Sequence, residues 1–404
     1  MLNNEKKIPL WAIDHAEKVK QKEELIGELL FFAAFFSYCI KYTLDYSGLI
    51  PVRPEILNSL FVGLCLICLI VKISLQRYTT SRFILIATIC IAMGYSSLIS
   101  INYNFLLSFL LIISMQDIEL EKIVKVGFFA KITSISVHVI WYIFVYNTNP
   151  SAIRFVWRVG GEARHFFFMG HANNFMAFLV WACLDFIYLN YEKLTVLHIV
   201  SVWLVNLIFY TFTDSNSGII VLAIVSILIF LDKMGKAAFD KLLTAFARFS
   251  YVFFALFFMF LTVIYTRLDG VLKEMWDSLD SFLTGRIWFG AYSYDVFGFT
   301  FIGRAFHSDV PAKIFWDGRW NDYFIPFDNY YLSNLYHYGI INLVFTALAF
   351  LIFTGKMENR EKIIIIAFSF YSIMEIYGNN IVICSALFII GKYIYRNKNI
   401  LEDS

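Results

Sequence analysis

Residues 161–190, GEARHFFFMGHANNFMAFLVWACLDFIYLN, join a polar stretch to an apolar run that is long enough to cross a membrane. A helix of about 20 apolar residues spans the roughly 30 Å hydrocarbon core of a bilayer. Asp185 carries the one carboxylate in the run from 170 to 190. The stretch therefore predicts a transmembrane helix whose first turn lies at a polar boundary, with Arg164 and His171 at its mouth.

The whole chain has the composition of an integral membrane protein. It contains 404 residues, of which 59% are hydrophobic and 16% charged, whereas soluble domains are about half apolar and about one quarter charged. Its formal net charge is +2, and its lysines and arginines are spread along the chain rather than gathered in one patch. The composition therefore favours a lipid bilayer as the surroundings and gives no reason to expect a nucleic-acid partner.

Hydropathy predicts an all-α protein with about twelve transmembrane helices. The apolar runs are residues 25–44, 55–75, 83–100, 103–115, 126–146, 170–190, 196–212, 218–231, 251–266, 340–355, 363–379 and 380–395. The expected organisation is a cytoplasmic N-terminal segment (1–24), spans one to nine (25–266), a large extracytoplasmic loop between spans nine and ten (267–339), spans ten to twelve (340–396) and a cytoplasmic tail (397–404). The charged first segment precedes a long apolar run without a small-residue cleavage site, so we expect no removable signal peptide.

Positive charge predicts that both termini are cytoplasmic, because lysine and arginine stay on the inner side of a membrane. With the N-terminus inside, 22 of the 33 basic residues fall on the inner side and ten on the outer side. Eight of those ten are arginines: Arg53, Arg154, Arg158, Arg164, Arg267, Arg286, Arg304 and Arg319. A guanidinium group binds phosphate or carboxylate through two parallel hydrogen bonds, so this preference indicates an anionic ligand outside.

The large outer loop is rich in aromatic residues, with 20 of them between positions 267 and 339. Such density is typical of a small packed subdomain, of an interfacial belt on the lipid headgroups, or of stacking surfaces for sugar rings. We expect packing to account for most of these rings and ligand contact for a few.

The stretch GEARHFFFMGHANNF (161–175) holds the first candidate site residues. Arg164 and His171 are seven residues apart, and His171 and Asn174 three apart, so a continuous helix would place all three on one face. That face is expected to line a water-filled cleft. The alternative is that His171 and Asn173 cap the helix, and for Asn173 the two interpretations stay open.

Three further motifs lie near the same predicted boundary. The turn TFTDSNSG (211–218) offers good capping residues, so a structural role is sufficient to explain it. In LTGRIWFGAY (283–292) Arg286 follows a Thr-Gly pair that suits a helix start. In PFDNYYLSNLYHYGIINL (326–343) Asp328 occupies an expected N-cap. Capping is one role for it and a carboxylate held over a cleft is the alternative, and the two do not exclude each other.

Ionisable residues inside the predicted spans are functional candidates by default. They are His138, Asp185, His198 and Glu375. We expect Asp185 and His198 to reach the cytoplasmic surface, which leaves Glu375, near the outer end of the eleventh span, as the one to test.

Together these motifs resemble those of the bacterial polysaccharide polymerases of the Wzy type and the O-antigen ligases. The matching segments are GHANNFMAF, TDSNSG, TGR and DNYYLSNLYHYGII, in that order, between about residues 160 and 345. The family patterns run roughly G-H-P-N-x-x-G, S-R-x-G, S-G-R and H-N-x-x-L-x-x-x-G-x-x-G. This chain departs from them at Ala172, Asn216 and Asp328, and the last change favours polymerase over ligase chemistry.

The resemblance implies polymerisation of undecaprenyl-diphosphate-linked repeat units into capsular, O-antigen or exopolysaccharide chains at the outer face of the cytoplasmic membrane. It implies a metal-independent glycosyltransferase without a cofactor, acting beside chain-length regulator and flippase proteins. The expected catalytic residues are His171 or Asp328 as general base and Arg286 on the diphosphate. The expected substrate-binding residues are Arg158, Arg164, His165, Asn174, Asn329 and Tyr331.

A different class of protein shares this predicted topology. Twelve spans with both termini inside also describe secondary transporters, including lipid-linked oligosaccharide flippases. Such transporters are built from paired repeats with broken helices at the midplane, and the two halves of this sequence show no convincing self-similarity. We therefore expect a polymerase first, a flippase second and a non-catalytic membrane scaffold third.

Overall fold

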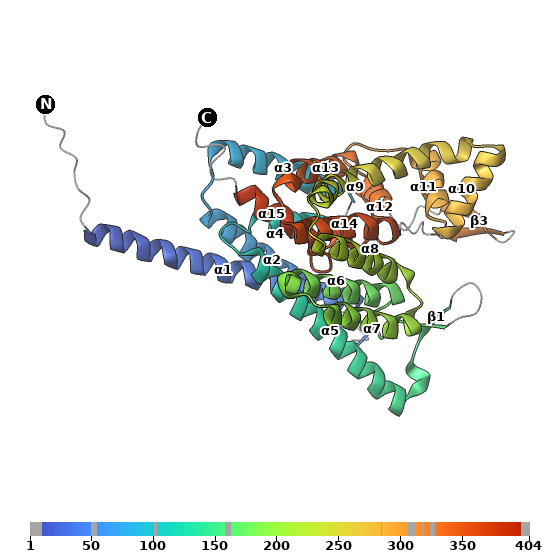
Figure 1. Cartoon of the computed structure of the whole chain (residues 1–404), viewed down its shortest axis with the longest axis horizontal. Helices are drawn as coiled ribbons and strands as arrows, with labels where there is room; N and C mark the ends of the chain where they lie inside the picture. Colours follow the sequence, from blue (N-terminus) through green and yellow to red (C-terminus); the bar gives the residue numbers. More distant parts are fainter. Residues whose placement is uncertain are drawn as a thin grey trace.

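The computed structural model describes residues 10–49, 55–100, 103–157, 163–283, 285–305, 312–316, 319–323 and 328–396. These residues are almost entirely helical, with fifteen α-helices and two short β-hairpins (Figure 1). The predicted all-α class is confirmed in this coarse sense.

Each predicted apolar run corresponds to one helix. These helices are α1 (Leu10–Tyr46), α2 (Glu55–Leu75), α3 (Thr80–Ser100), α4 (Asn104–Ile113), α5 (Leu120–Thr148), α6 (Ala172–Asn190), α7 (Val196–Thr213), α8 (Asn216–Lys233), α9 (Ala237–Ile264), α13 (Ile340–Phe353), α14 (Asn359–Met374) and α15 (Ala386–Arg396). Among the described residues, eight helices are long and apolar enough to cross a membrane, namely α1 to α3 and α5 to α9. The chain is therefore membrane-embedded.

Two helices, α6 and α14, form the centre of the bundle. Residues 363–369 of α14 are buried without interruption, and α6 is the most enclosed of the eight long helices. The outer helices α2 and α7 instead expose apolar side chains such as Ile67 and Leu204. A helix that is apolar all round lies in a protein core or in lipid, so the outer helices face the bilayer and α6 and α14 face protein.

The eleventh predicted span ends earlier than expected. Helix α14 stops at Met374, because Glu375 takes an extended conformation (φ −143°, ψ 149°). An irregular segment with the short turn η5 (Tyr377–Asn379) then leads to α15. Such backbone is tolerated at membrane depth where protein satisfies it, and Lys131 Nζ does so by donating to the carbonyl of Val382 at 2.9 Å.

A buried ion pair stabilises this irregular segment. Lys131 Nζ on α5 lies 2.9 Å from Asp185 Oδ2 on α6, and each side chain is 1% exposed. Ser385 Oγ donates to Asp185 Oδ1 at 2.5 Å. The expectation that Asp185 reaches the cytoplasmic surface is therefore wrong. Its charge is neutralised inside the protein by a lysine of α5 instead.

The large loop contains helices of its own: α10 (Gly270–Phe282), α11 (Arg286–Phe297) and α12 (Tyr330–His337), with the hairpin β3 (Ala312–Trp316)–β4 (Arg319–Tyr323). The second hairpin, β1 (Phe155–Trp157)–β2 (Ala163–His165), follows the turn η1 (Pro150–Ala152). The remaining short turns are η2 (Tyr191–Lys193), η3 (Tyr265–Arg267) and η4 (Thr354–Lys356). In Figure 1, α10, α11, β1 and β3 lie at one end of the molecule, whereas α1 extends away at the other.

Among the aromatic residues of this loop that the structure describes, four tyrosines are packed in the core. Tyr330, Tyr331, Tyr336 and Tyr338 are each 1% exposed or less. The ring of Tyr331 stacks on that of Phe258 of α9 with centroids 6.1 Å apart. These contacts hold α12 against the bundle and so place the residues that precede it.

Candidate functional site

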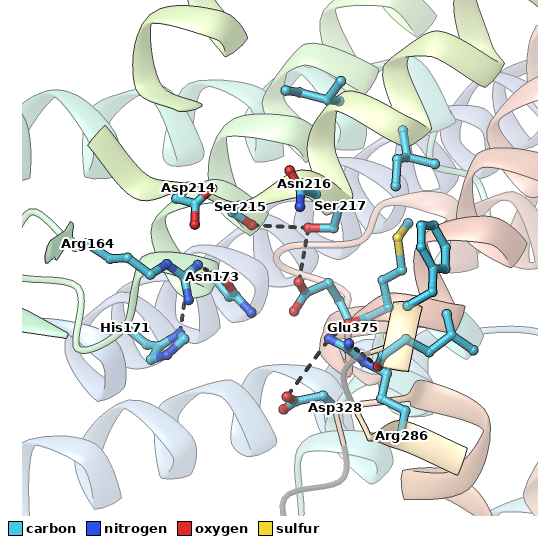
Figure 2. A pocket seen from close by; sticks show the side chains of 15 residues that line it. Arg164, His171, Asn173, Asp214, Ser215, Asn216, Ser217, Arg286, Asp328 and Glu375 are labelled. Atoms are coloured by element: carbon cyan, nitrogen blue, oxygen red, sulfur yellow. Dashed lines mark hydrogen bonds and ion pairs between the residues drawn. The ribbon is translucent and has the colours of Figure 1, made fainter. Parts of the chain in front are cut away.

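A cavity of about 450 Å³ lies where the N-termini of α6 and α8, the start of α11 and the end of α14 meet. Its polar lining residues are Arg164, His171, Asn173, Asp214, Ser215, Asn216, Ser217, Arg286, Asp328 and Glu375. Figure 2 shows Arg164 and Arg286 on opposite sides, with the carboxylate of Glu375 between them. A cavity of this size with convergent polar groups is typical of a ligand site.

Arg164 is held on the cavity wall by strand β2. Its Nε donates to the carbonyl of Thr213 at 2.6 Å, its Nη2 donates to Asn173 Oδ1 at 2.8 Å, and the residue is 9% exposed. The expectation that a continuous helix carries Arg164 and His171 is wrong. The left-handed backbone of Phe167, at φ 48°, and of its neighbours turns the chain before α6 begins.

Arg286 begins helix α11, as its sequence motif predicts. Gly285 precedes it with φ 82°, a left-handed conformation that suits glycine. The Arg286 guanidinium donates to the carbonyl of Leu283 through Nη1 and to that of Met374 through Nη2, both at 2.7 Å. Met374 is the last residue of α14, and Thr213, which binds Arg164, is the last of α7. Each arginine therefore binds the negative end of a helix.

His171 both caps α6 and lines the cavity. Its Nδ1 accepts a hydrogen bond from the backbone N–H of Asn173 at 3.2 Å. Burial, helped by the positive charge of Arg164 and opposed by Asp328, lowers the pKa of the imidazole. A neutral ring whose Nδ1 accepts carries its proton on Nε2. The Nδ1 of His171 is therefore occupied by the start of α6.

Asp328 precedes α12 without capping it. The N-cap is Asn329, whose Oδ1 accepts from the N–H of Leu332 at 3.1 Å. The expected cap at Asp328 is therefore wrong by one residue. Asp328 Oδ2 instead lies 3.9 Å from Arg286 Nη2, and its side chain is 53% exposed. A pair this long whose carboxylate is half-exposed is weak, so an incoming anion can replace it.

The turn between α7 and α8 contributes more than its motif indicates. Asp214 ends α7 in a left-handed conformation, and Ser215 begins α8 without a capping bond from its side chain. Ser217 Oγ donates to Glu375 Oε1 at 3.0 Å. The motif by itself indicates only a helix cap. The contact of Ser217 with Glu375 is not visible in the sequence, because Glu375 lies far along the chain.

Glu375 is the most enclosed carboxyl group of the cavity. It is 4% exposed and lies just beyond α14, outside the eight long apolar helices. Burial, opposed by Arg286 and reinforced by Asp328, raises its pKa from an ordinary value of 4.5 to about 8. A buried carboxyl group next to cations changes its charge near neutral pH.

Four of the predicted substrate-binding residues do not line the cavity. The Tyr142 hydroxyl and His165 Nδ1 lie 2.5 Å apart, in an aromatic cluster. Asn174 binds the carbonyl of Met169 and the Tyr377 hydroxyl, Asn329 binds the carbonyl of Ile373, and Tyr331 binds that of Ser369. These residues position the cavity walls. The fifth, Arg158, lies outside the described residues.

No protein-family model, curated protein or solved structure matches this chain. Nor do three His, Cys, Asp or Glu side chains come together as metal ligands within the part of the chain that the structure describes.

The cavity combines groups of both charges. Two guanidinium groups line it, together with the carboxyl groups of Asp214, Asp328 and Glu375. The N-termini of α6 and α8, which carry the positive ends of their helix dipoles, are directed at it as well. The guanidinium groups and the helix N-termini suit a phosphate or diphosphate ester.

Proposed function

We propose that this chain is a membrane glycosyltransferase that polymerises undecaprenyl-diphosphate-linked oligosaccharide repeat units into capsular, O-antigen or exopolysaccharide chains. The observation that carries the proposal is the placement of Arg164 and Arg286 on opposite sides of one cavity. Arg286 belongs to the TGR segment, which resembles a motif of the Wzy-type polymerases and O-antigen ligases, and Arg164 lies shortly before the GHANNFMAF segment, which resembles another.

The proposed topology has both termini in the cytoplasm. The eight long helices span the membrane, and α4, α13, α14 and α15 enter it with protein around them. The cavity then opens on the extracytoplasmic face, where α10 and α11 of the large loop gather. The excess of positive charge on the opposite loops supports this orientation.

The cavity suits the departure of a diphosphate group. The acceptor hydroxyl of one repeat unit attacks the anomeric carbon of the growing chain, and undecaprenyl diphosphate leaves. Arg164 and Arg286 bind the negative charge that develops on the leaving group, and His171 donates a hydrogen bond to it from Nε2. The incoming diphosphate replaces Asp328 as the partner of Arg286. Arg158 is retained as a candidate third cation.

A direct test uses the native host and two single variants, Arg164→Ala and Arg286→Ala. The surface glycan, separated on a gel, is expected to shrink to single-repeat products in both, while membrane insertion stays normal. Arg154→Ala is the matched control, because Arg154 is an exposed arginine that does not line the cavity. Long chains of normal distribution from both cavity variants would reject the proposal.

A lipid-linked oligosaccharide flippase is the second candidate, for one structural reason. The irregular segment from Glu375 to Ser385 separates α14 from α15, and broken helices mark the substrate sites of many transporters. A flippase predicts that loss of the cavity arginines leaves lipid-linked repeats on the inner leaflet. A polymerase predicts that they accumulate on the outer leaflet, so a membrane-impermeant sugar-oxidising reagent separates the two.

A further inference from the structure

Two carboxyl groups of the cavity, those of Asp214 and Glu375, have no role in the reaction as proposed so far. We propose that Glu375 is the general base that takes the proton from the acceptor hydroxyl, an inference that rests on the proposed glycosyl transfer. A sugar hydroxyl is a weak nucleophile until a positioned base accepts its proton in the transition state.

The other two candidate bases, His171 and Asp328, are less suited to accept the proton than Glu375. The accepting nitrogen of His171 is bound to the backbone N–H of Asn173, so a proton can be accepted there only by breaking the cap of α6. Asp328 is half-exposed at the cavity rim and faces Arg286. Glu375 is 4% exposed and lies between the two arginines. It is therefore the carboxyl group nearest the middle of the proposed diphosphate site.

The carboxylate of Glu375 has a fixed orientation. Ser217 Oγ donates to its Oε1 at 3.0 Å, and Ser215 Oγ lies 3.3 Å from Ser217 Oγ. Both serines belong to the turn that begins α8. A base whose rotamer is locked by a neighbouring hydrogen bond meets its substrate without further loss of side-chain entropy.

The surrounding charges adjust the proton affinity of Glu375 to neutral pH. Arg286 and Arg164 face it from α11 and β2, Asp328 faces it from the residue before α12, and the phenols of Tyr371 and Tyr377 flank it. Burial dominates, so the pKa is about 8. When a diphosphate neutralises the arginines, that proton affinity rises further, so substrate binding itself strengthens the base.

The proposed step balances in atoms and charge. The oxygen of the acceptor forms a bond to the anomeric carbon while its proton moves to the ionised carboxylate of Glu375. The bond from the anomeric carbon to the diphosphate oxygen breaks, and its electron pair stays on the diphosphate between Arg164 and Arg286. Glu375 then releases the proton to water in the cavity, which restores the carboxylate.

The experiment measures single-turnover rates of the full chain in lipid nanodiscs with a synthetic polyprenyl-diphosphate-linked oligosaccharide as donor and acceptor. In the wild type the rate is expected to rise with pH and level off above the pKa of Glu375. Glu375→Gln keeps the acceptor atom for Ser217 and is expected to bind donor normally, to lose about 10²- to 10⁴-fold in rate, and to lose the pH dependence. A rate within about threefold of wild type, with the same pH profile, would overturn the proposal, because general-base catalysis is worth far more.

Two additions separate this inference from the proposed function. Glu375→Asp retains a carboxylate, so its rate is expected to depend on pH still, with a shifted midpoint. A merely structural role of Glu375 would not produce such a shift. Inorganic pyrophosphate is titrated calorimetrically in two buffers near pH 8. Net proton uptake is expected to be larger in the wild type than in Glu375→Gln, because the protons of pyrophosphate itself titrate in both. Equal uptake in both rejects the base. Absence of any polymer from a correctly folded wild type rejects the polymerase, whatever Glu375 does.

Discussion

Ser217 Oγ donates a hydrogen bond of 3.0 Å to Glu375 Oε1 across 158 residues of sequence. This bond joins the first turn of α8 to the end of α14, and both residues line the cavity. Ser217 does not stand out in its turn, whereas Glu375 is the ionisable residue of a predicted span that the sequence marks for testing, and no pattern along the chain links the two. Their contact makes the turn part of the candidate site.

Ser217→Ala is expected to displace the pH profile of the reaction to higher pH. Burial raises the pKa of Glu375, and the Ser217 hydrogen bond opposes that effect. Losing a hydrogen bond to a charged group costs about 1.5–3 kcal/mol, which is about one to two pH units. Single-turnover rates against pH measure the displacement. Ser215→Ala is the control, and an equal displacement there would contradict a specific role for Ser217.

Arginine-to-lysine changes at the two cavity arginines are expected to weaken binding of inorganic pyrophosphate by about 10- to 100-fold each, because lysine lacks the planar fork. Arg164 makes hydrogen bonds to both Thr213 and Asn173, and Arg286 to both Leu283 and Met374. One ammonium group cannot reproduce that geometry. Calorimetric titration measures the affinity, and Arg154→Lys is expected to bind like the wild type. Unchanged affinity in both cavity variants would exclude them as the anion clamp.

Gly218→Ala is expected to destabilise the helix pair α6–α8. A Cβ atom at Gly218 would lie 2.5 Å from Val180 Cγ2 and 3.3 Å from Asn206 Nδ2. Overpacking of this kind costs about 1–3 kcal/mol. Thermal unfolding in detergent should show a lower midpoint, with recovery in the double variant Gly218→Ala/Val180→Ala. Gly63→Ala meets nothing within 4 Å and should unfold like the wild type. A normal midpoint for Gly218→Ala would show that the α6–α8 contact relaxes freely.

Replacing one residue of the buried pair between α5 and α6 is expected to lower the free energy of unfolding strongly. Replacing both residues is expected to lower it much less. Lys131 and Asp185 are each 1% exposed. Removal of one partner leaves a buried charge and costs about 3–5 kcal/mol, whereas an apolar pair of similar volume is often nearly neutral. Lys131→Met, Asp185→Leu and the double variant form a cycle of unfolding measurements. Strictly additive effects would mean that the two charges do not stabilise each other.

The stability of the protein is expected to fall as the pH rises from about 4.5 to about 8, the ordinary and the folded pKa of Glu375. A raised carboxyl pKa means that the folded state holds the proton more tightly. The stabilisation is complete below pH 4.5, declines as the pH rises and is lost above about pH 8. The free energy of unfolding changes by at most a few kcal/mol over this range. Glu375→Gln should remove this component of the pH dependence. An unchanged slope in that variant would assign the titration to another group.

Local sequence patterns predict the elements of this fold well. Every apolar run becomes a helix, Gly285 becomes the N-cap of the helix that Arg286 begins, and the tyrosines of the DNYYLSNLYHYGII segment become core residues. These outcomes depend on hydrophobicity and on backbone conformation, which neighbouring residues largely set. The errors concern helix boundaries and the surroundings of Asp185, which is buried against Lys131 instead of reaching the surface. Helix α6 does not extend back to Arg164, and the cap of α12 is Asn329 rather than Asp328.

The sequence by itself determined that the chain lies in a membrane and where its helices run, and it indicated Arg164 and Arg286, in two motifs, as candidate anion ligands. Only the tertiary structure decided which polar groups share a cavity. It brought Glu375 to Ser217 and placed Arg164 opposite Arg286, while it turned His165, Asn174 and Tyr331 into supports of the walls. The physical reason is that burial and hydrogen-bond partners depend on contacts between helices, which periodicity along one helix does not encode.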